Sequence, residues 1–301
     1  MATTPSSRPV LGRALCAMIT PFTPTGALDL EGAQRLAVHL VAEGCDGLVL
    51  SGTTGESPTT TDQEKADLIR AVRAAVGPDV PLVAGVGTAD TRHTTELSRA
   101  AEKAGATGLL VAPPYYSRPP QEALEAHFRE IADATALPVL LYDIPARTGV
   151  RITPATILRL SDHPRITGVK DCAYDLLGTQ KVLSRTDLAY YAGCDEQILA
   201  LYAVGATGYI STAANVIPTQ LRAILTEFDA GNTGTATHHQ HAALDLIDLL
   251  MATPLPGTVT TKTLLTTLNL PAGPVRPPLQ PADETVTRRL REAYERLVGR
   301  T

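Results

Sequence analysis

A lysine at the end of an apolar segment has the clearest chemical potential in this sequence. Lys170 closes the run Ile166–Lys170 and is followed by Asp171. If the run is a β-strand, the stem of Lys170 lies between apolar neighbours, where burial disfavours the ammonium and leaves a nucleophilic amine. Such an amine can form an imine with a carbonyl substrate. A solvated lysine that simply ends a strand fits the same pattern, so the choice depends on which residues lie beside it.

A loop rich in glycine and threonine follows another apolar run. Residues 51–57 (SGTTGES) contain two glycines that let a small ligand approach the backbone. Thr53, Thr54 and the adjacent backbone N–H groups could bind a carboxylate. The loop is not a phosphate-binding loop of the Walker type, since no lysine follows the last glycine. A turn that caps the next helix explains the loop equally well.

Phenols and a guanidinium follow two further runs. Tyr142 ends one of them, where its hydroxyl could transfer protons, and Arg147 lies a few residues beyond with two parallel donors for a carboxylate. An ion pair between Arg147 and Asp143 is the alternative. Tyr115 and Tyr116 come after paired prolines, and we expect such tyrosines to pack, to form hydrogen bonds or to cross a subunit interface.

Eight short apolar runs alternate with helix-like segments, such as 29–43 and 62–76, which place apolar residues on one face. The alternation predicts an α/β fold, a (β/α)₈ TIM barrel, with parallel strands buried on both faces. The ends of the strands then meet at one rim, which brings Lys170, Tyr142, Thr53, Thr54 and Arg147 together. The predicted strands are 14–20, 47–50, 82–85, 108–112, 139–142, 166–170, 188–192 and 208–211.

A repeated turn supports this interpretation. The segments 44–49, 105–110 and 205–210 share a pattern of two glycines three residues apart, followed by apolar residues. The first glycine suits a left-handed helix end, and the second lets the next strand start close to that helix. After the eighth run the chain is predicted to be helical, over 221–228, 235–251, 259–268 and 283–298. We therefore divide the chain into a disordered tail (1–11), a barrel (12–230) and a C-terminal helical appendage (231–301).

Composition excludes several classes of function. The chain has 301 residues and a net charge of −5, which argues against a nucleic-acid or anionic-membrane surface. No apolar run is long enough to span a membrane. Its 4 cysteines lack a C-x-x-C pair, which favours free thiols in the reducing cytoplasm. The histidines 238, 239 and 241 are expected to lie on a solvated helix face, so we expect no metal site.

Five motifs, taken together and in order, resemble those of the dihydrodipicolinate synthase / N-acetylneuraminate lyase family. The resemblance runs from about Gly12 to the C-terminus and is strongest to the synthases of actinobacterial type, through residues 51–64 and 141–149. The motifs are GTTGE at 52–56, PYY at 114–116, YDIPARTG at 142–149, GVKD at 168–171 and GYIS at 208–211.

This resemblance implies a class I aldolase without a metal or organic cofactor, commonly a homotetramer. Lys170 would form the imine with pyruvate, and Thr54 with nearby backbone N–H groups would hold the pyruvate carboxylate. Tyr142, Thr53 and Tyr116 would relay protons, with Tyr116 reaching into the site of a partner subunit. Arg147 would bind the carboxylate of L-aspartate semialdehyde. Gly193 and the backbone at Ile210 would line the pocket. The implied product is 4-hydroxy-tetrahydrodipicolinate.

The sequence departs from the family pattern at two positions. Cys194 precedes Asp195 where two aspartates are common, and Pro113 replaces the usual threonine before Pro-Tyr-Tyr. These changes leave open a relative with another aldehyde or a sugar acid as substrate. A non-catalytic barrel that binds a small acid is the alternative from a different class, although it would need no imine-forming lysine.

The lysine-binding positions of lysine-sensitive members also look different here. They carry Asp62, Lys65, Ala89 and His93, while Ser57 and Tyr115 are retained. Lys65 would repel the ammonium of the effector, so the sequence predicts weak or absent inhibition by lysine.

Overall fold

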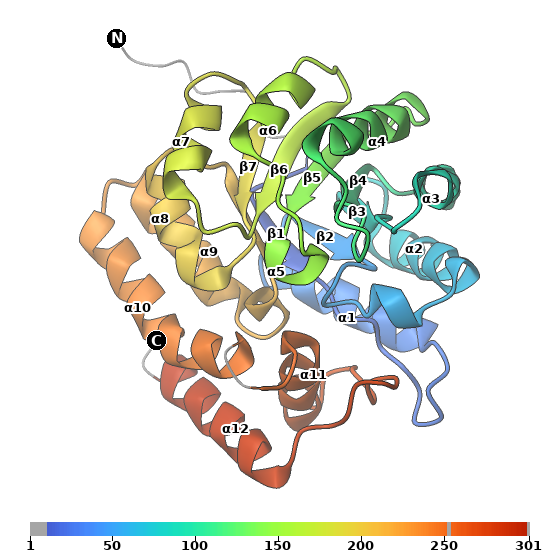
Figure 1. Ribbon diagram of the computed structural model, residues 1–301. Helices are drawn as coiled ribbons and strands as arrows, with labels where there is room; N and C mark the ends of the chain where they lie inside the picture. The colour runs from blue at the N-terminus through green and yellow to red at the C-terminus, as the bar shows by residue number, and fades with distance from the viewer. Residues whose placement is uncertain (1–10, 252–253, 300–301) are drawn as a thin grey trace.

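The computed structural model describes residues 11–251 and 254–299 and contains a closed barrel of eight parallel strands, with β1 paired to β8 (Figure 1). This confirms the predicted (β/α)₈ barrel. The strands are β1 (Ala14–Ala17), β2 (Gly47–Leu50), β3 (Leu82–Gly85), β4 (Gly108–Val111), β5 (Val139–Asp143), β6 (Ile166–Asp171), β7 (Ala189–Ala192) and β8 (Gly208–Ser211).

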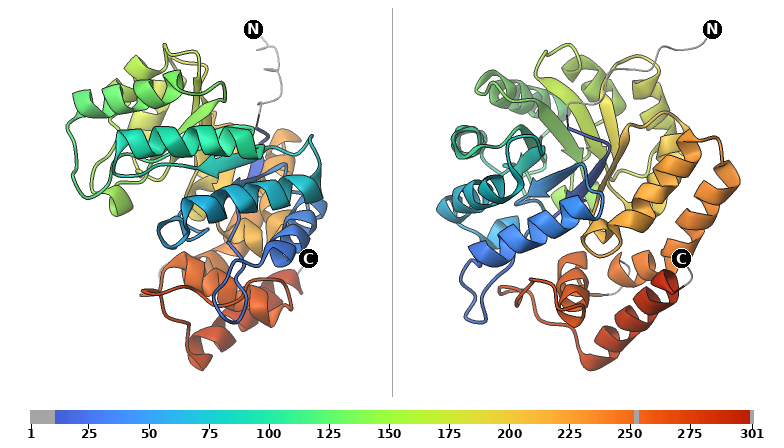
Figure 2. Two further views of the ribbon diagram at one scale, coloured as in Figure 1. Left: turned by 90° about the vertical axis from the view of Figure 1, so that its right-hand side faces the viewer. Right: turned by 180° about the vertical axis from the view of Figure 1, so that it is seen from behind.

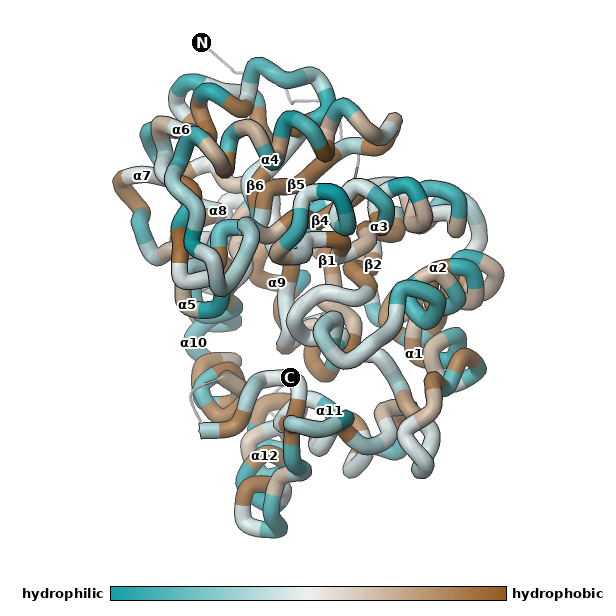
Figure 3. Tube along the Cα trace, turned by 45° about the vertical axis from the view of Figure 1, so that its right-hand side comes forward, coloured by the Kyte–Doolittle hydropathy of each residue, from teal (hydrophilic) through white to brown (hydrophobic). Residues whose placement is uncertain are grey.

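The strands form where apolar, β-branched residues follow one another without interruption. Almost every strand residue is buried, because the barrel interior covers one face and the helices cover the other (Figure 3). Leu11, the last residue of the expected tail, is also described; its side chain is buried with the residues of the barrel interior. The rest of that tail, 1–10, lies outside the described residues.

Helices surround the barrel and connect its strands. They are α1 (Leu30–Ala42), α2 (Asp62–Val76), α3 (Thr91–Ala104), α4 (Gln121–Asp133), α5 (Pro145–Thr148), α6 (Pro154–Leu160), α7 (Leu176–Leu183), α8 (Ile198–Ala203) and α9 (Pro218–Asp229), with 3₁₀ turns η1 (Ser57–Thr59), η2 (Asp195–Gln197) and η3 (Ala213–Asn215). The helix α2 begins and ends where the sequence predicted.

The repeated αβ turn has the expected backbone, with one difference. Gly44, Gly105 and Gly205 have φ of 105°, 101° and 106°, a region that side chains other than glycine rarely adopt. The second glycine, however, does not make room for the preceding helix. A β-carbon on Gly208 would lie 1.9 Å from the carbonyl oxygen of Arg13, which precedes the neighbouring strand β1. The glycine therefore allows two strands to start side by side.

Three further helices follow the barrel: α10 (Thr233–Met251), α11 (Gly257–Thr267) and α12 (Glu284–Val298). They lie together at one side of the barrel, coloured orange to red in Figures 1 and 2, and α10 packs along α9 and α12. The division of the chain at residue 230 stays a prediction. No helix among the described residues is both long and apolar enough to cross a membrane.

Candidate active site

Lys170 lies on the inner face of the barrel between tyrosines of the two neighbouring strands. Parallel pairing aligns Tyr142 of β5 with Lys170 of β6, and Lys170 with Tyr191 of β7. Residues in register on adjacent strands project from the same face of a sheet, so the three side chains share the barrel interior. Lys170 is 5% exposed, and its Nζ lies 4.4 Å from the centre of the Tyr142 ring. An amine in this position is shielded from bulk water.

The phenol of Tyr142 is held in its neutral form. Burial raises its pKa well above the ordinary value for tyrosine, and nearby Cys172 acts in the same direction. A hydrogen bond with the side chain of Thr53 acts the other way without overcoming burial. A neutral phenol that interacts with a hydroxyl can accept one proton while it donates another, so that no net charge remains on the two groups. Tyr142 and Thr53 are therefore brought together in a way that suits proton transfer.

The loop between β2 and α2 is held in a strained conformation at both of its ends. Ser51 and Glu56 have φ of 54° and 55°, which costs non-glycine residues on the order of 1–3 kcal/mol each. Between them, Thr54 is buried, and its Oγ1 lies 2.9 Å from Oγ1 of Thr212. Thr53 is exposed and faces a cavity. The surrounding structure must supply the interactions that keep this loop in place.

The C-terminal helices supply part of that support. Thr258 of α11 donates a hydrogen bond to the carbonyl oxygen of Thr53 over 3.3 Å. Nζ of Lys262, also on α11, lies 2.6 Å from Oε1 of Glu56 in an ion pair whose side chains are only 2% and 1% exposed. Lys262 also donates to the carbonyl oxygen of Pro274 at 2.8 Å. The loop that contains Thr53 is thus fixed from a distant part of the sequence.

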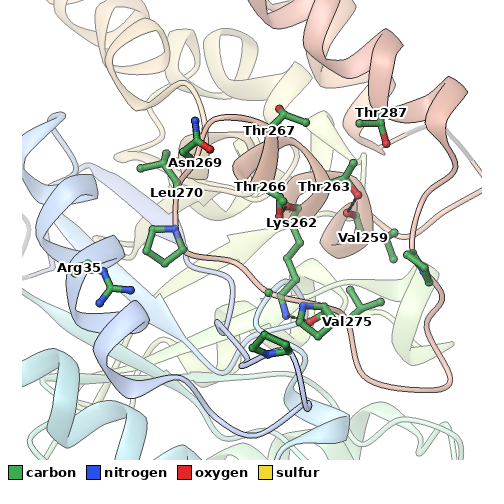
Figure 4. Close-up of a pocket in the computed structure, with 15 residues that line it drawn as sticks. Arg35, Val259, Lys262, Thr263, Thr266, Thr267, Asn269, Leu270, Val275 and Thr287 are labelled. Carbon is green, nitrogen blue, oxygen red and sulfur yellow. Dashed lines mark hydrogen bonds between the residues drawn. The ribbon is translucent and has the colours of Figure 1, made fainter.

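The sequence alone did not indicate this connection. Figure 4 shows Lys262 extending from α11 toward the segment that contains Val275, at a cavity of about 970 Å³ between α11, α1 and the loops beside them. None of the predicted site residues lines this cavity. The only available signal was a single lysine in a helix otherwise made of threonine and apolar residues, and nothing near it in sequence indicated Glu56 as its partner.

A second cavity, of about 420 Å³, opens at the predicted rim. Thr53, Tyr142 and Arg147 line it, whereas Lys170, Thr54, Gly193 and Ile210 do not. Farther out, it is bordered by several of the positions discussed above for lysine sensitivity: Ser57, Asp62, Lys65, His93 and Tyr115.

Arg147 is available to bind an anion. It lies on the short helix α5, is exposed, and forms no ion pair within the part of the chain that the structure describes. The alternative, an ion pair with Asp143, is absent there. Asp143 is instead buried and accepts a hydrogen bond from the backbone N–H of Ile152 at 2.9 Å. Burial raises the pKa of Asp143 to about 7.

Gly193 and Ile210 lie deeper than the other predicted residues. A β-carbon on Gly193 would come within 3.0 Å of Cε of Lys170, so the absence of a side chain leaves space beside the lysine stem. Ile210 is fully buried in the barrel interior, and its backbone pairs with β1. Both residues are therefore near the base of the site.

Tyr116 is not brought into the site within a single chain. Its side chain is 96% exposed, and its backbone has φ of 70°, in the left-handed region. Tyr115 next to it lines the smaller cavity and is 42% exposed. Within one chain, the structure leaves the side chain of Tyr116 in solvent.

No group of three or more metal-ligating side chains comes together among residues 11–251 and 254–299. His238 and His239 lie on α10 with ring centres 6.2 Å apart, and His238 is exposed.

The family profile described as "Dihydrodipicolinate synthetase family" matches residues 10–297. The chain is 70% identical over 299 residues to 4-hydroxy-tetrahydrodipicolinate synthase 1 of Streptomyces coelicolor, covering 99% of this chain and 98% of that protein.

Solved structures show the same fold. The dihydrodipicolinate synthase of Bacillus anthracis is 35% identical with a TM-score of 0.91, covering 95% of this chain and 98% of that one. The enzyme of Cyanidioschyzon merolae with lysine bound is 34% identical with a TM-score of 0.92, covering 96% and 98%.

Proposed function

The chain belongs to the dihydrodipicolinate synthetase family, and we infer that its barrel rim performs the reaction of the synthases in that family. The protein is a lyase, a pyruvate-dependent class I aldolase. It condenses pyruvate with L-aspartate semialdehyde to give 4-hydroxy-tetrahydrodipicolinate, a step toward diaminopimelate and lysine.

The observation that carries our assignment of the site is the position of Lys170. Its amine is buried in register with Tyr142, whose phenol is hydrogen-bonded to Thr53. A buried amine beside a neutral proton donor is what formation of an imine requires, because the carbonyl oxygen must leave as water. A barrel that only bound small acids would gain nothing from these two groups.

In the first half of the proposed mechanism, the amine of Lys170 attacks C2 of pyruvate and water leaves. Thr54 and the backbone N–H groups beside it hold the pyruvate carboxylate. The imine acts as an electron sink, so a methyl proton is lost and an enamine forms. Tyr142 and Thr53 move the protons of these steps. The lysine does this work directly, and the mechanism needs no metal or organic cofactor.

In the second half, the enamine attacks the aldehyde carbon of L-aspartate semialdehyde and a C–C bond forms. Arg147, exposed at the cavity without an ion-pair partner among the described residues, orients the carboxylate of this second substrate. The amino group of the substrate then attacks the imine carbon. It displaces the amine of Lys170 and closes the ring.

We also propose a homotetramer whose partner subunits exchange Tyr116. Its 96% exposure within one chain supports this proposal. A second exposed apolar surface at the start of α7, which includes Leu177 at 63% exposure, would provide a separate contact between dimers. The four cysteines are free, which supports a cytoplasmic location.

Borohydride reduction in the presence of pyruvate, followed by peptide mass spectrometry, tests the assignment of Lys170. We expect a reduced pyruvyl adduct on Lys170 and none on Lys262, which is buried at the junction with the appendage and serves as the matched control. The aldehyde is tested by turnover with L-aspartate semialdehyde against a set of sugar acids. A folded protein that gives no adduct on Lys170 would refute the proposed mechanism.

Complementation tests the role of Tyr116. Chains with Lys170→Ala or Tyr116→Phe are each expected to have low activity. In a mixed dimer, the Tyr116→Phe chain keeps Lys170 and receives Tyr116 from its partner, so one complete site is restored. If Tyr116 acted within its own chain, mixing would restore nothing.

A further inference from the structure

Two thiols lie side by side at the end of the barrel where Lys170 is found. Cys172 follows β6 and Cys194 follows β7, two strands whose pairing ends with Asp171 beside Ala192. The thiols are close enough for each to shift the pKa of the other. Cys194 packs against the cluster of interior residues that includes Cys172. Adjacent parallel strands thus bring the two sulfur atoms within reach of each other.

The thiol of Cys172 also borders the proposed catalytic groups. A β-carbon on Gly193 would lie 2.4 Å from Sγ of Cys172 and 3.0 Å from Cε of Lys170, so both atoms flank the same glycine. Cys172 also lies close enough to Tyr142 to raise the pKa of its phenol. Any displacement of this sulfur therefore affects the space occupied by the lysine and the phenol.

The two thiols are not equivalent. Cys194 is partly exposed, and hydrogen bonds from Cys172 and then Tyr174 lower its pKa, against the effect of burial. Cys172 is 7% exposed, and its hydrogen bond to Cys194, together with burial, raises its pKa well above the usual range. An oxidant from solvent reaches Cys194 first, and its thiolate is the better nucleophile of the two.

The chain contains a matched comparison for this pair. The thiols of Cys16 on β1 and Cys45 also interact, but they are 0% and 4% exposed in the core between the barrel and its helices. Burial raises the pKa of Cys16 well above the usual range. Two thiols are thus in contact in both pairs, but only the pair at the barrel rim, Cys172 and Cys194, is accessible from the solvent.

We propose that Cys172 and Cys194 form an oxidisable dithiol that hydroperoxides convert to a disulfide, switching the active site off. The thiolate of Cys194 attacks the O–O bond of hydrogen peroxide and becomes a sulfenic acid, and the other oxygen leaves as water after protonation. The thiol of Cys172 then attacks the sulfenic sulfur, forming the S–S bond and releasing a second water. Two thiols are oxidised and one peroxide is reduced to two waters.

Closing the bond changes the site directly. An S–S bond of about 2.05 Å is far shorter than a contact between two thiols, so the sulfur atoms must approach each other, and we expect Sγ of Cys172 to shift. That shift removes its contact with Tyr142 and alters the packing at Gly193 beside Lys170. The effect on activity rests on the proposed function of Lys170, whereas the formation of the disulfide does not.

Peptide mapping after treatment of the reduced protein with hydrogen peroxide tests the proposal. Trypsin places each cysteine in a different peptide: 14–35, 36–65, 171–181 and 186–222. We expect a crosslink between 171–181 and 186–222 with none between 14–35 and 36–65. In parallel, turnover and borohydride trapping of pyruvate should fall by the fraction crosslinked and return with dithiothreitol. The Cys194→Ser variant should keep its own untreated rate through the same treatment.

Three results would overturn the proposal. The first is the absence of the crosslink in peroxide-treated protein. The second is equal oxidation of Cys16 and Cys45, which would indicate unfolding and not a specific site. The third is a crosslinked protein that still traps pyruvate and turns over at the original rate. An untreated protein that fails to trap pyruvate, with the crosslink formed as expected, would refute the proposed function and leave the dithiol standing.

Discussion

Replacing Lys262 with methionine is expected to destabilise the protein strongly, although this residue touches no substrate. The exchange keeps an unbranched side chain, one atom shorter, and removes its charge. Oε1 of Glu56 would then be left as a buried carboxylate oxygen, since it has no conventional hydrogen-bond partner among the described residues apart from its ion pair with Lys262. Removing one partner of a buried ion pair costs about 3–5 kcal/mol. That is a large fraction of the roughly 5–15 kcal/mol by which domains are stable.

The charge itself, and not the shape of the side chain, should determine this cost. In the double variant Glu56→Gln with Lys262→Met, no charge remains buried. The Gln side chain can still accept the hydrogen bond that the backbone N–H of Arg276 donates to Oε2 of Glu56 at 2.9 Å. We therefore expect the double variant to recover most of the lost stability, with a coupling energy of about 2–3 kcal/mol between the two positions.

Urea unfolding of the wild type, both single variants and the double variant measures this coupling. Turnover at a temperature where all four are folded gives a second readout, because Glu56 ends the loop that holds Thr53 and Thr54. The Lys262→Met variant should lose activity and the double variant should regain part of it. A loss below about 1 kcal/mol in Lys262→Met, or a double variant whose losses simply add, would refute the reasoning.

Four other perturbations have expected outcomes that follow from the structure. Burial raises the pKa of Asp143 to about 7, so the folded protein holds this proton more tightly than the unfolded chain does. The free energy of unfolding therefore falls as pH rises from about 4 to 7. In urea unfolding, Asp143→Asn should be more stable than the wild type at pH 8, by on the order of 3–4 kcal/mol, and equal to it near pH 4. A hydrogen bond from Arg276 lowers the pKa of Glu64 to about 2, so the stabilisation that Glu64 provides is present above pH 4.5 and is lost as pH falls through 2. Glu64→Gln should therefore lower the free energy of unfolding by about 2–3 kcal/mol at pH 7 and by progressively less in acid. A difference that does not depend on pH would contradict this. Tyr142→Phe should still give the borohydride adduct, but more slowly, while kcat falls about 10²- to 10⁴-fold, and an unchanged kcat would exclude the phenol from the relay. Because Lys65 brings a cation to the cavity, a lysine titration should inhibit turnover weakly or not at all, and clear inhibition at sub-millimolar lysine would count against that prediction.

The strands could be predicted closely because apolar runs bounded by polar residues fix both of their ends. The runs at Gly47–Leu50, Leu82–Gly85 and Gly208–Ser211 are strands with those bounds. The first run was predicted too long, since it continues to Thr20 whereas β1 ends at Ala17. Met18 and Ile19 are 1% exposed, so they remain apolar and buried after the chain has left the sheet. An apolar segment indicates that its residues are buried, and here the buried residues continue beyond those that form hydrogen bonds between strands.

The candidate site was predictable to the extent that it depends on strand ends. Parallel strands place Lys170 and Tyr142 at the same edge whatever the details of packing, so an apolar run that ends in each residue is enough to bring them together. No comparable rule predicts the ion pair between Glu56 and Lys262. It depends on where α11 packs, and no pattern near either residue specifies that contact. The position of Tyr116 is likewise set by a loop, for which the sequence offers no comparable rule.

The helices after the barrel therefore contact the loop that carries Thr53 and Thr54. The threonine loop begins and ends with residues in a left-handed conformation, Ser51 and Glu56, which it would not adopt without external restraint. Glu56 is restrained by Lys262 and by the backbone of Arg276, and Thr53 by Thr258, all of which belong to or follow α11. No strand of the barrel includes these residues, whereas the loop that contains Thr53 and Thr54 is held by contacts with them. This dependence gives a physical reason for the helical appendage to accompany the barrel in this chain.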